Sequence, residues 1–232
     1  MSAIWQILQD QLVPFMDAMV MTLKLTSVSL SLAVVIGLVV ALLKLSRHRP
    51  LNWIANVYIG LIRGTPLIVQ LMFLYFGISR VVVLSSFWAG SLALAVHCGA
   101  YVAEIFRGAI QSIDKGQMEA ARSLGVSHWK AMRLVILPQA LRIAIPPLGN
   151  QFIIGLKDSS LVAYLGVMEL FGAALSAQAE NFQPFQTYMA VGLYYLVLVL
   201  IFTLIVNWLE RRLDKANAGR ALDTRMQRMQ SA

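Results

Sequence analysis

The chain has 232 residues, of which 59% are hydrophobic and 13% charged, and its mean hydropathy is +0.71. This composition excludes a soluble globular domain and indicates a single integral membrane domain. The net charge of +8 does not point to nucleic acid, because membrane proteins carry their Lys and Arg residues mainly on cytoplasmic loops. We therefore expect membrane lipid, and no nucleic acid, among the partners of this chain.

The N-terminal third carries two apolar stretches. Residues 1–20 contain acidic residues and a proline and lack the basic start and cleavage motif of a signal peptide, so we expect an interfacial segment there. Residues 25–43 are nineteen uncharged residues, enough for one membrane crossing. Residues 51–79 form a second apolar stretch, which Arg63-Gly64-Thr65-Pro66 interrupts.

The rest of the chain predicts three more spans. Residues 81–103 form the third. Residues 143–156 carry two prolines and two glycines, a composition typical of a broken helix packed inside a bundle. Residues 159–184 are moderately apolar and either re-enter the membrane or lie along its surface. Residues 185–208 form the last span.

The predicted fold class is therefore all-α, a polytopic membrane protein with about five transmembrane helices. One domain is expected over residues 1–215, followed by a basic, loosely ordered cytoplasmic tail over residues 216–232. Fifteen of the nineteen Lys and Arg residues lie on one side of the five predicted spans. The positive-inside rule makes that side the cytoplasm, so we expect the N-terminus outside and the C-terminus inside.

The longest polar interval between apolar spans is residues 116–138, GQMEAARSLGVSHWKAMRLVILP. A short run of helix formers precedes Gly125, which can adopt a left-handed helix stop at low cost. Ser127 suits the N-cap of a second helix that starts at His128 and that Pro138 ends or kinks. The interval thus predicts a helix–turn–helix on the cytoplasmic side. Such a rigid unit is suited to docking into a partner's groove.

The same interval resembles a family signature. Glu119-Ala120-Ala121, three residues, Gly125, nine residues, Val135, one residue and Leu137-Pro138 resemble the EAA motif of permease subunits of binding-protein-dependent ABC importers. Val135 stands where that family most often has Ile, and Ser159 where it more often has Thr. Further stretches resemble the polar amino-acid branch, namely 63–67 (RGTPL), 101–108 (YVAEIFRG), 111–117 (QSIDKGQ) and 156–161 (LKDSSL). The resemblance covers roughly residues 15–213.

The resemblance implies a MetI-like permease in the bacterial inner (plasma) membrane that translocates a polar amino acid. It also implies three partners: an ABC ATPase dimer, a second permease copy or paralogue, and a periplasmic or lipoprotein solute-binding protein. ATP and Mg would bind the ATPase, so this chain would hold no cofactor and would not be an enzyme. Contact with the ATPase is assigned to Glu119, Ala120, Ala121 and Gly125.

Polar groups inside the bilayer are the candidates for a solute pathway, because they are costly there unless paired or facing water. An amino acid carries a carboxylate and an ammonium group, which suit a buried Arg and a buried carboxylate. The candidates are Arg63, Thr65, Glu104, Asp158 and Ser159. The alternative is that Arg63 pairs with Glu104 or Asp158 and only fixes helix packing.

Two other classes compete with this interpretation. A self-contained secondary transporter or channel for small polar solutes would also need buried charge, but such carriers often show an inverted repeat, which is not evident here. A membrane enzyme would need a catalytic constellation, and the sequence offers no catalytic or metal-binding motif. The solute, which could be glutamine, cystine, histidine or arginine, stays open. So does the choice between homodimer and heterodimer.

Overall fold

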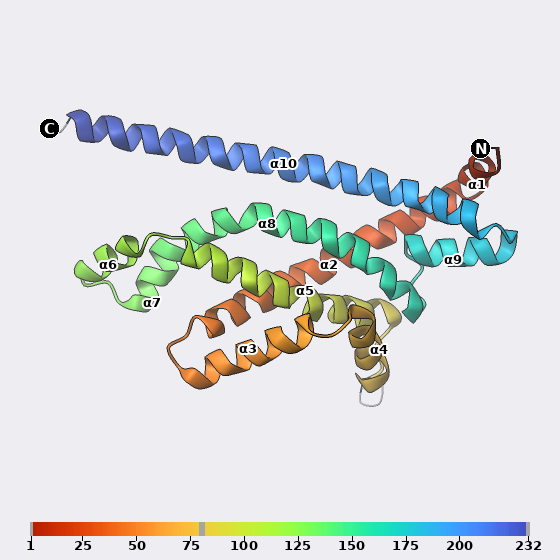
Figure 1. Cartoon of the computed structure of the whole chain (residues 1–232), viewed down its shortest axis with the longest axis horizontal. Helices are drawn as coiled ribbons and strands as arrows, with labels where there is room; N and C mark the ends of the chain where they lie inside the picture. Colours follow the sequence, from red (N-terminus) through yellow and green to blue (C-terminus); the bar gives the residue numbers. More distant parts are fainter. Residues whose placement is uncertain (1, 79–81, 231–232) are drawn as a thin grey trace.

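The computed structural model describes residues 2–78 and 82–230, with side chains for residues 4–77 and 82–213. The described chain folds into helices and contains no strand (Figure 1). In chain order the helices are α1 (Ser2–Asp10), α2 (Leu12–Lys44), α3 (Arg49–Arg63), α4 (Leu67–Ile78), α5 (Ser86–Gln111), α6 (Lys115–Ser123), α7 (His128–Ala131), the π-helix η1 (Met132–Ile136), α8 (Leu137–Asp158), the 3-10 helix η2 (Ser159–Leu165), α9 (Leu170–Asn181) and α10 (Pro184–Gln230).

Within the described residues, four helical segments are long and apolar enough to cross a membrane: Leu12–Lys44, Ser86–Gln111, His128–Leu165 and Pro184–Leu213. A fifth crossing is available if α3 and α4, which meet at a bend of 108°, are counted as one broken span. This architecture confirms the all-α fold and the expectation of about five spans.

Helix α5 is the centre of the bundle, because α2, α3, α4 and α8 all pack against it. Its buried face is built largely from small residues, including Ala93, Ala100 and Ala103, each 0% exposed. Small side chains let membrane helices approach closely, and van der Waals packing then holds them together. Both α3 and α4 pack against this helix, and Gln70, near the bend between them, contacts His97 on α5.

A second apolar cluster closes the end of the molecule that holds the N-terminus. Helices α1, α2, α9 and α10 meet there around Phe15 and Leu170, both 0% exposed. The ring of Phe15 contacts the ring of Tyr194 edge-on at a centroid distance of 5.4 Å. This cluster places α9 beside α2 and α10 and fixes the geometry of the loop that leads into α9.

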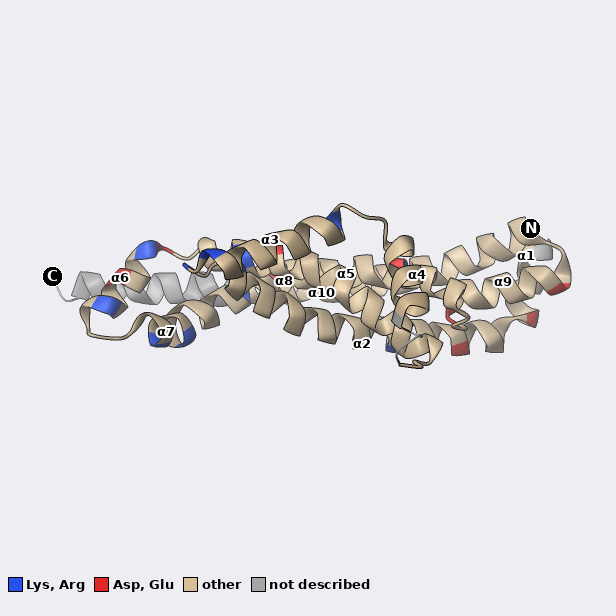
Figure 2. Cartoon of the chain, turned by 90° about the horizontal axis from the view of Figure 1, so that it is seen from below, with Lys and Arg blue, Asp and Glu red and all other residues tan. Residues whose placement is uncertain are grey.

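Charge is divided along the long axis of the molecule (Figure 2). Basic residues gather around α6, α7 and the near ends of α2 and α3, whereas acidic residues mark the end formed by α1 and α9. The axis runs parallel to the long apolar helices, so the two ends correspond to the two faces of a membrane.

Several predicted boundaries were wrong. The helix of the first span begins at Leu12 rather than at residue 25. Its 33 residues exceed the ~20 residues that a bilayer requires, so its first turns extend beyond the hydrocarbon core and can carry charge. The third span begins at Ser86 and runs on to Gln111. Residues 159–184 contain η2 and α9 and reach the first residue of α10; that they re-enter the membrane or lie along its surface stays a prediction. A loosely ordered tail was expected over residues 216–232, whereas helix α10 continues through Gln230; the side chains of these residues lie outside the described part.

Pro138 does not end a helix, contrary to one reading of the sequence. It is the second residue of α8, and its missing N–H leaves one carbonyl of the preceding turn without its backbone donor. The π-helix η1 directly precedes it and provides the wider turn that lets the chain continue without a break. A single helical path therefore runs from α7 through η1 into α8.

Candidate functional site

The turn between α6 and α7 has the geometry that the sequence predicts. Gly125 lies at φ +78°, a left-handed conformation that glycine adopts without strain. The Val126 N–H donates to the Ala121 carbonyl at 3.2 Å, which closes the end of α6. Ser127 is the N-cap of α7, and its hydroxyl accepts a hydrogen bond from the Lys130 N–H at 3.5 Å. The predicted stop and cap are thus confirmed, and the two helices form a defined projection, here called the knob (residues 114–131).

The start of the knob is fixed as well. Asp114 is the N-cap of α6, and its carboxylate accepts a hydrogen bond from the Gly116 N–H at 2.7 Å. A capping residue of this kind stabilises a helix by about 1 kcal/mol. The sequence analysis did not assign this role to Asp114.

The knob presents an apolar surface to solvent. Leu124 is 83% exposed and Trp129 64% exposed. Exposed apolar residues that cluster on an otherwise polar loop mark an interaction surface. Glu119 and Ala120 are exposed as well, whereas Ala121 is buried and α6 packs against η1. Of the predicted contact residues, Ala121 therefore faces inward and supports the knob from within.

A groove of about 510 Å³ lies where α3, α5 and α8 meet. Its lining combines polar and apolar side chains: Arg63, Tyr101, Glu104, Ile105, Gly108, Ala109, Ser112, Ile143, Pro147 and Gln151. Arg63 places its guanidinium over the Tyr101 ring, 5.3 Å from the centroid, a cation–π contact. The structure thus brings two predicted solute residues, Arg63 and Glu104, to one groove.

The proposed pairing of Arg63 with a carboxylate is not found. Glu104 pairs instead with the Lys44 ammonium, Nζ to Oε1 at 2.6 Å, and with the Arg107 guanidinium, Nη2 to Oε2 at 2.8 Å. Among the described side chains these are the only ion pairs, so Arg63 pairs with neither Glu104 nor Asp158. Arg63 keeps its charge directed at the groove, and Glu104 ties the end of α2 to α5.

Thr65 belongs to a hydrogen-bond network that holds the bend between α3 and α4. The Gln70 amide donates to the Thr65 hydroxyl at 2.8 Å and to the Ile62 carbonyl at 2.8 Å. The Gln70 oxygen lies 2.9 Å from His97 Nδ1 on α5. Neither Gln70 nor His97 was among the predicted site residues, although polar residues inside apolar spans were a usable signal.

Asp158 and Ser159 lie elsewhere, at the junction of α8 and η2. Ser159 is fully buried, and its hydroxyl donates to the Leu156 carbonyl at 2.8 Å. Asp158 is half-buried and does not line the groove that holds Arg63 and Glu104. The five predicted pathway residues therefore fall into three separate places: the groove, the bend and the end of α8.

Glu169 is a buried carboxylate that the sequence analysis missed. It is 0% exposed and caps α9, where its Oε1 accepts a hydrogen bond from the Gly172 N–H at 2.8 Å. Its Oε2 accepts from the Tyr195 hydroxyl at 2.6 Å and from Thr22 at 3.5 Å. No described basic side chain pairs with it. Glu169 thus joins α2, α9 and α10 through hydrogen bonds alone.

Burial raises the pKa of the Glu169 carboxyl above its usual value, and the hydrogen bonds from Tyr195 and Gly172 only oppose this shift. An unfolded Glu ionises around pH 4.5, whereas the folded chain holds the proton to higher pH. The free energy of unfolding should therefore fall as pH rises from about 4.5 to the raised pKa of the folded state, because folding takes up a proton in that window.

We expect Glu169→Gln to remove this pH dependence, since the amide keeps the shape of the side chain without its charge. The melting temperature of the purified variant should exceed that of the wild type by a margin that grows from pH 4.5 toward neutral. Glu180→Gln is the control, because Glu180 is exposed on the same helix, and it should follow the wild type. Parallel curves for wild type and Glu169→Gln would show that Glu169 is ionised without cost.

Comparison with known proteins bears on these sites. A family model described as "Binding-protein-dependent transport system inner membrane component" matches residues 33–215. The chain is 39% identical over 211 residues to the probable glutamine ABC transporter permease protein GlnM of Bacillus subtilis (strain 168), covering 90% of this chain and 98% of that protein. It is 40% identical to the arginine transport system permease protein ArtQ of the same organism, covering 87% and 93%. It is 41% identical to the glutamine transport system permease protein GlnP of Escherichia coli (strain K12), covering 83% and 90%.

Solved structures show the same likeness. A chain from the crystal structure of an amino acid ABC transporter with histidines superposes with a TM-score of 0.81 at 42% identity, covering 88% of this chain and 96% of that one. A chain of the inward-facing MetNI methionine ABC transporter superposes with a TM-score of 0.78 over 88% and 98%. Its identity of 21% speaks for the fold alone.

Proposed function

The chain belongs to the binding-protein-dependent transport system inner membrane component family and is a permease subunit of an ABC importer, and we propose that the solute it translocates is a polar amino acid. The observation that carries this proposal is the likeness, at about 40% identity over nearly the whole chain, to permeases named for glutamine and arginine. The same likeness favours this function over a self-contained secondary transporter or channel.

We further propose that the knob docks into a separate ABC ATPase dimer, which would bind the ATP and Mg. Three features support docking: both knob helices are capped, the turn is set by Gly125 at φ +78°, and Leu124 and Trp129 are exposed. A preformed surface loses little conformational entropy on binding. Glu119, Ala120 and Gly125 would lie at or near this contact, with Ala121 behind them.

The groove between α3, α5 and α8 is our proposed site for the solute. Arg63 offers a guanidinium to a carboxylate group, and Tyr101 on α5 and Gln151 on α8 line the same groove. The groove is open on one side, so a second permease copy or paralogue would be needed to enclose a solute. A periplasmic or lipoprotein solute-binding protein would deliver it. Asp158 and Ser159 remain candidates for a separate point on the route.

The test is uptake by proteoliposomes that contain the permease with its ATPase and solute-binding protein. Uptake should require ATP, and Arg63→Gln should lower the uptake per assembled complex by about five-fold or more, because losing a charged hydrogen-bond partner costs ~1–3 kcal/mol. Arg49→Gln, at the other end of α3, is the matched control and should transport normally.

Asp158→Asn, measured for a neutral and a cationic amino acid, shows whether Asp158 also meets solute. If it does, uptake of the cationic solute should fall more. Normal uptake of both would remove Asp158 from the route. Solute movement by the purified chain alone, without ATPase, would contradict the proposed function itself.

For the orientation, we propose that the N-terminus is outside and that the knob and C-terminus are cytoplasmic. The support is the Lys and Arg bias of the sequence and its concentration at the knob end (Figure 2). In a Cys98→Ala background, Ser123→Cys should react only with reagents that reach the cytoplasm, and Ser85→Cys only with reagents outside. Both positions are exposed. Labelling of Ser85→Cys from the cytoplasm would reverse the orientation.

A further inference from the structure

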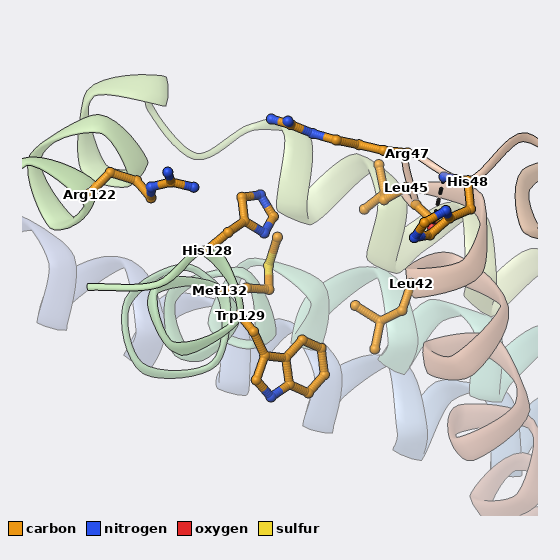
Figure 3. Close-up of a pocket in the computed structure, with 9 residues that line it drawn as sticks. Leu42, Leu45, Arg47, His48, Arg122, His128, Trp129 and Met132 are labelled. Atoms are coloured by element: carbon orange, nitrogen blue, oxygen red, sulfur yellow. Dashed lines mark hydrogen bonds between the residues drawn. The ribbon is translucent and has the colours of Figure 1, made fainter. Parts of the chain in front are cut away.

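A second cavity lies between the end of α2 and the knob (Figure 3). Its volume is about 380 Å³. The lining residues are Leu42, Leu45, Ser46, Arg47, His48, Arg122, His128, Trp129 and Met132. None of them lines the groove proposed for the solute. Transport of an amino acid therefore gives this cavity no role.

The polar side of the cavity is basic. Arg47 and Arg122 extend toward each other from opposite sides, with the His128 ring between them and the His48 ring nearby (Figure 3). No carboxylate lines the cavity, and the ion pairs among the described side chains all involve Glu104. Two guanidinium groups that face one another repel, and an anion between them would remove that repulsion. The geometry is that of an anion site.

The opposite side is apolar and continuous with the membrane-spanning part of the chain. Leu42 and Leu45 lie at the end of the first span, and Met132 closes the wall from η1. Trp129 is 64% exposed, and tryptophan is enriched where a membrane meets water. An inorganic anion would leave this apolar wall uncovered, whereas a molecule with a charged head and an apolar chain would cover both sides.

We propose that this cavity binds the phosphate headgroup of an anionic phospholipid from the leaflet next to the knob. Arg47 and Arg122 hold the phosphate oxygens, since guanidinium groups bind phosphate through paired, charge-assisted hydrogen bonds. The acyl chain lies along Leu42 and Leu45. The lipid thereby connects the end of α2 with the knob. Side chains from both parts of the chain line this cavity.

The experiment measures lipid retained by the full chain, alone and assembled with its ATPase, by native mass spectrometry during titration with phosphatidylglycerol or phosphatidylcholine. Wild type should retain phosphatidylglycerol selectively. Arg47→Gln and Arg122→Gln should each weaken its binding about five-fold, and the double variant about twenty-five-fold, as expected from ~1 kcal/mol per basic residue near an anionic membrane. Arg49→Gln is the control, because Arg49 is exposed two residues away and does not line the cavity.

Three results would overturn the proposal. The first is unchanged phosphatidylglycerol retention in both single variants, which decides the matter even if the double variant fails to fold. The second is displacement of the lipid by an equal concentration of inorganic phosphate, which would identify a site for a soluble anion. The third is retention by the isolated chain but not by the assembled importer, which would show that the ATPase covers the cavity.

Discussion

Gly125→Pro should abolish solute-stimulated ATP hydrolysis by the assembled importer while leaving the chain in the membrane. Gly125 lies at φ +78°, which proline cannot adopt, because its ring fixes φ near −65°. The substitution also removes the N–H that donates to the Arg122 carbonyl at 3.0 Å. The turn must therefore open, at a cost of ~3 kcal/mol or more. The knob lies outside the membrane-spanning helices, so insertion should proceed normally.

The matched control at this position is Gly125→Asn. Asparagine tolerates the left-handed conformation better than most residues, and no atom lies within 4 Å of an added Cβ. Stimulation by solute-loaded binding protein should therefore stay close to wild type in this variant. The two variants are compared at equal permease levels, determined by immunoblotting of membranes. Full stimulation in Gly125→Pro would show that the knob geometry does not carry coupling.

Gly37→Leu should prevent the bundle from packing. Gly37 lies on α2 where it meets α5, and a Cβ added there would fall 2.5 Å from Val102 Cγ1 and 2.9 Å from the Ala103 backbone nitrogen. Backbone cannot move aside as a side chain can, so the helices would have to separate. Overpacking of a close-packed core costs ~1–3 kcal/mol, and a leucine at this contact should reach or exceed the upper end.

Melting temperature and the monodisperse fraction after purification measure this effect. Gly37→Ala should already lower the melting temperature, whereas Gly60→Ala should not, because no atom lies within 4 Å of a Cβ added at Gly60. An exposed helical Gly→Ala change stabilises by ~0.5–1 kcal/mol, so the two variants should shift in opposite directions. A Gly37→Ala variant that melts with or above wild type would mean that α2 and α5 have room to adjust.

Features set by short stretches of chain could be predicted from the sequence. The number of spans follows from runs of apolar residues, and the knob turn follows from Gly125 and Ser127, whose effects are local. The exact span ends could not be predicted, because hydropathy shows only the part that crosses the bilayer. A helix such as α2, with its 33 residues, extends beyond it. Pro138 is ambiguous as well, since its effect depends on whether the helical turn before it widens, as η1 does.

The pairing of polar residues could not be predicted, because it depends on which helices become neighbours. Glu104 was a candidate partner for Arg63, yet α2 brings Lys44 to it at 2.6 Å. Glu169 lies in a moderately apolar stretch, and its environment is built by Thr22 and Tyr195, which are 147 and 26 residues away in the chain. The family resemblance rests on short sequence motifs, and such motifs do not specify which side chains pair.

The knob is joined to the membrane by two unlike connections. On one side, α7 continues through η1 into α8 without a gap, so the segment His128–Leu165 is one continuous helical path of 38 residues. On the other side, residues 112–114 separate α5 from α6 and can act as a hinge. A push on the knob should therefore swing α8 as a lever while α5 stays in place among its neighbours. The groove of Arg63 and Glu104 lies between these two helices, so the same push would change its width.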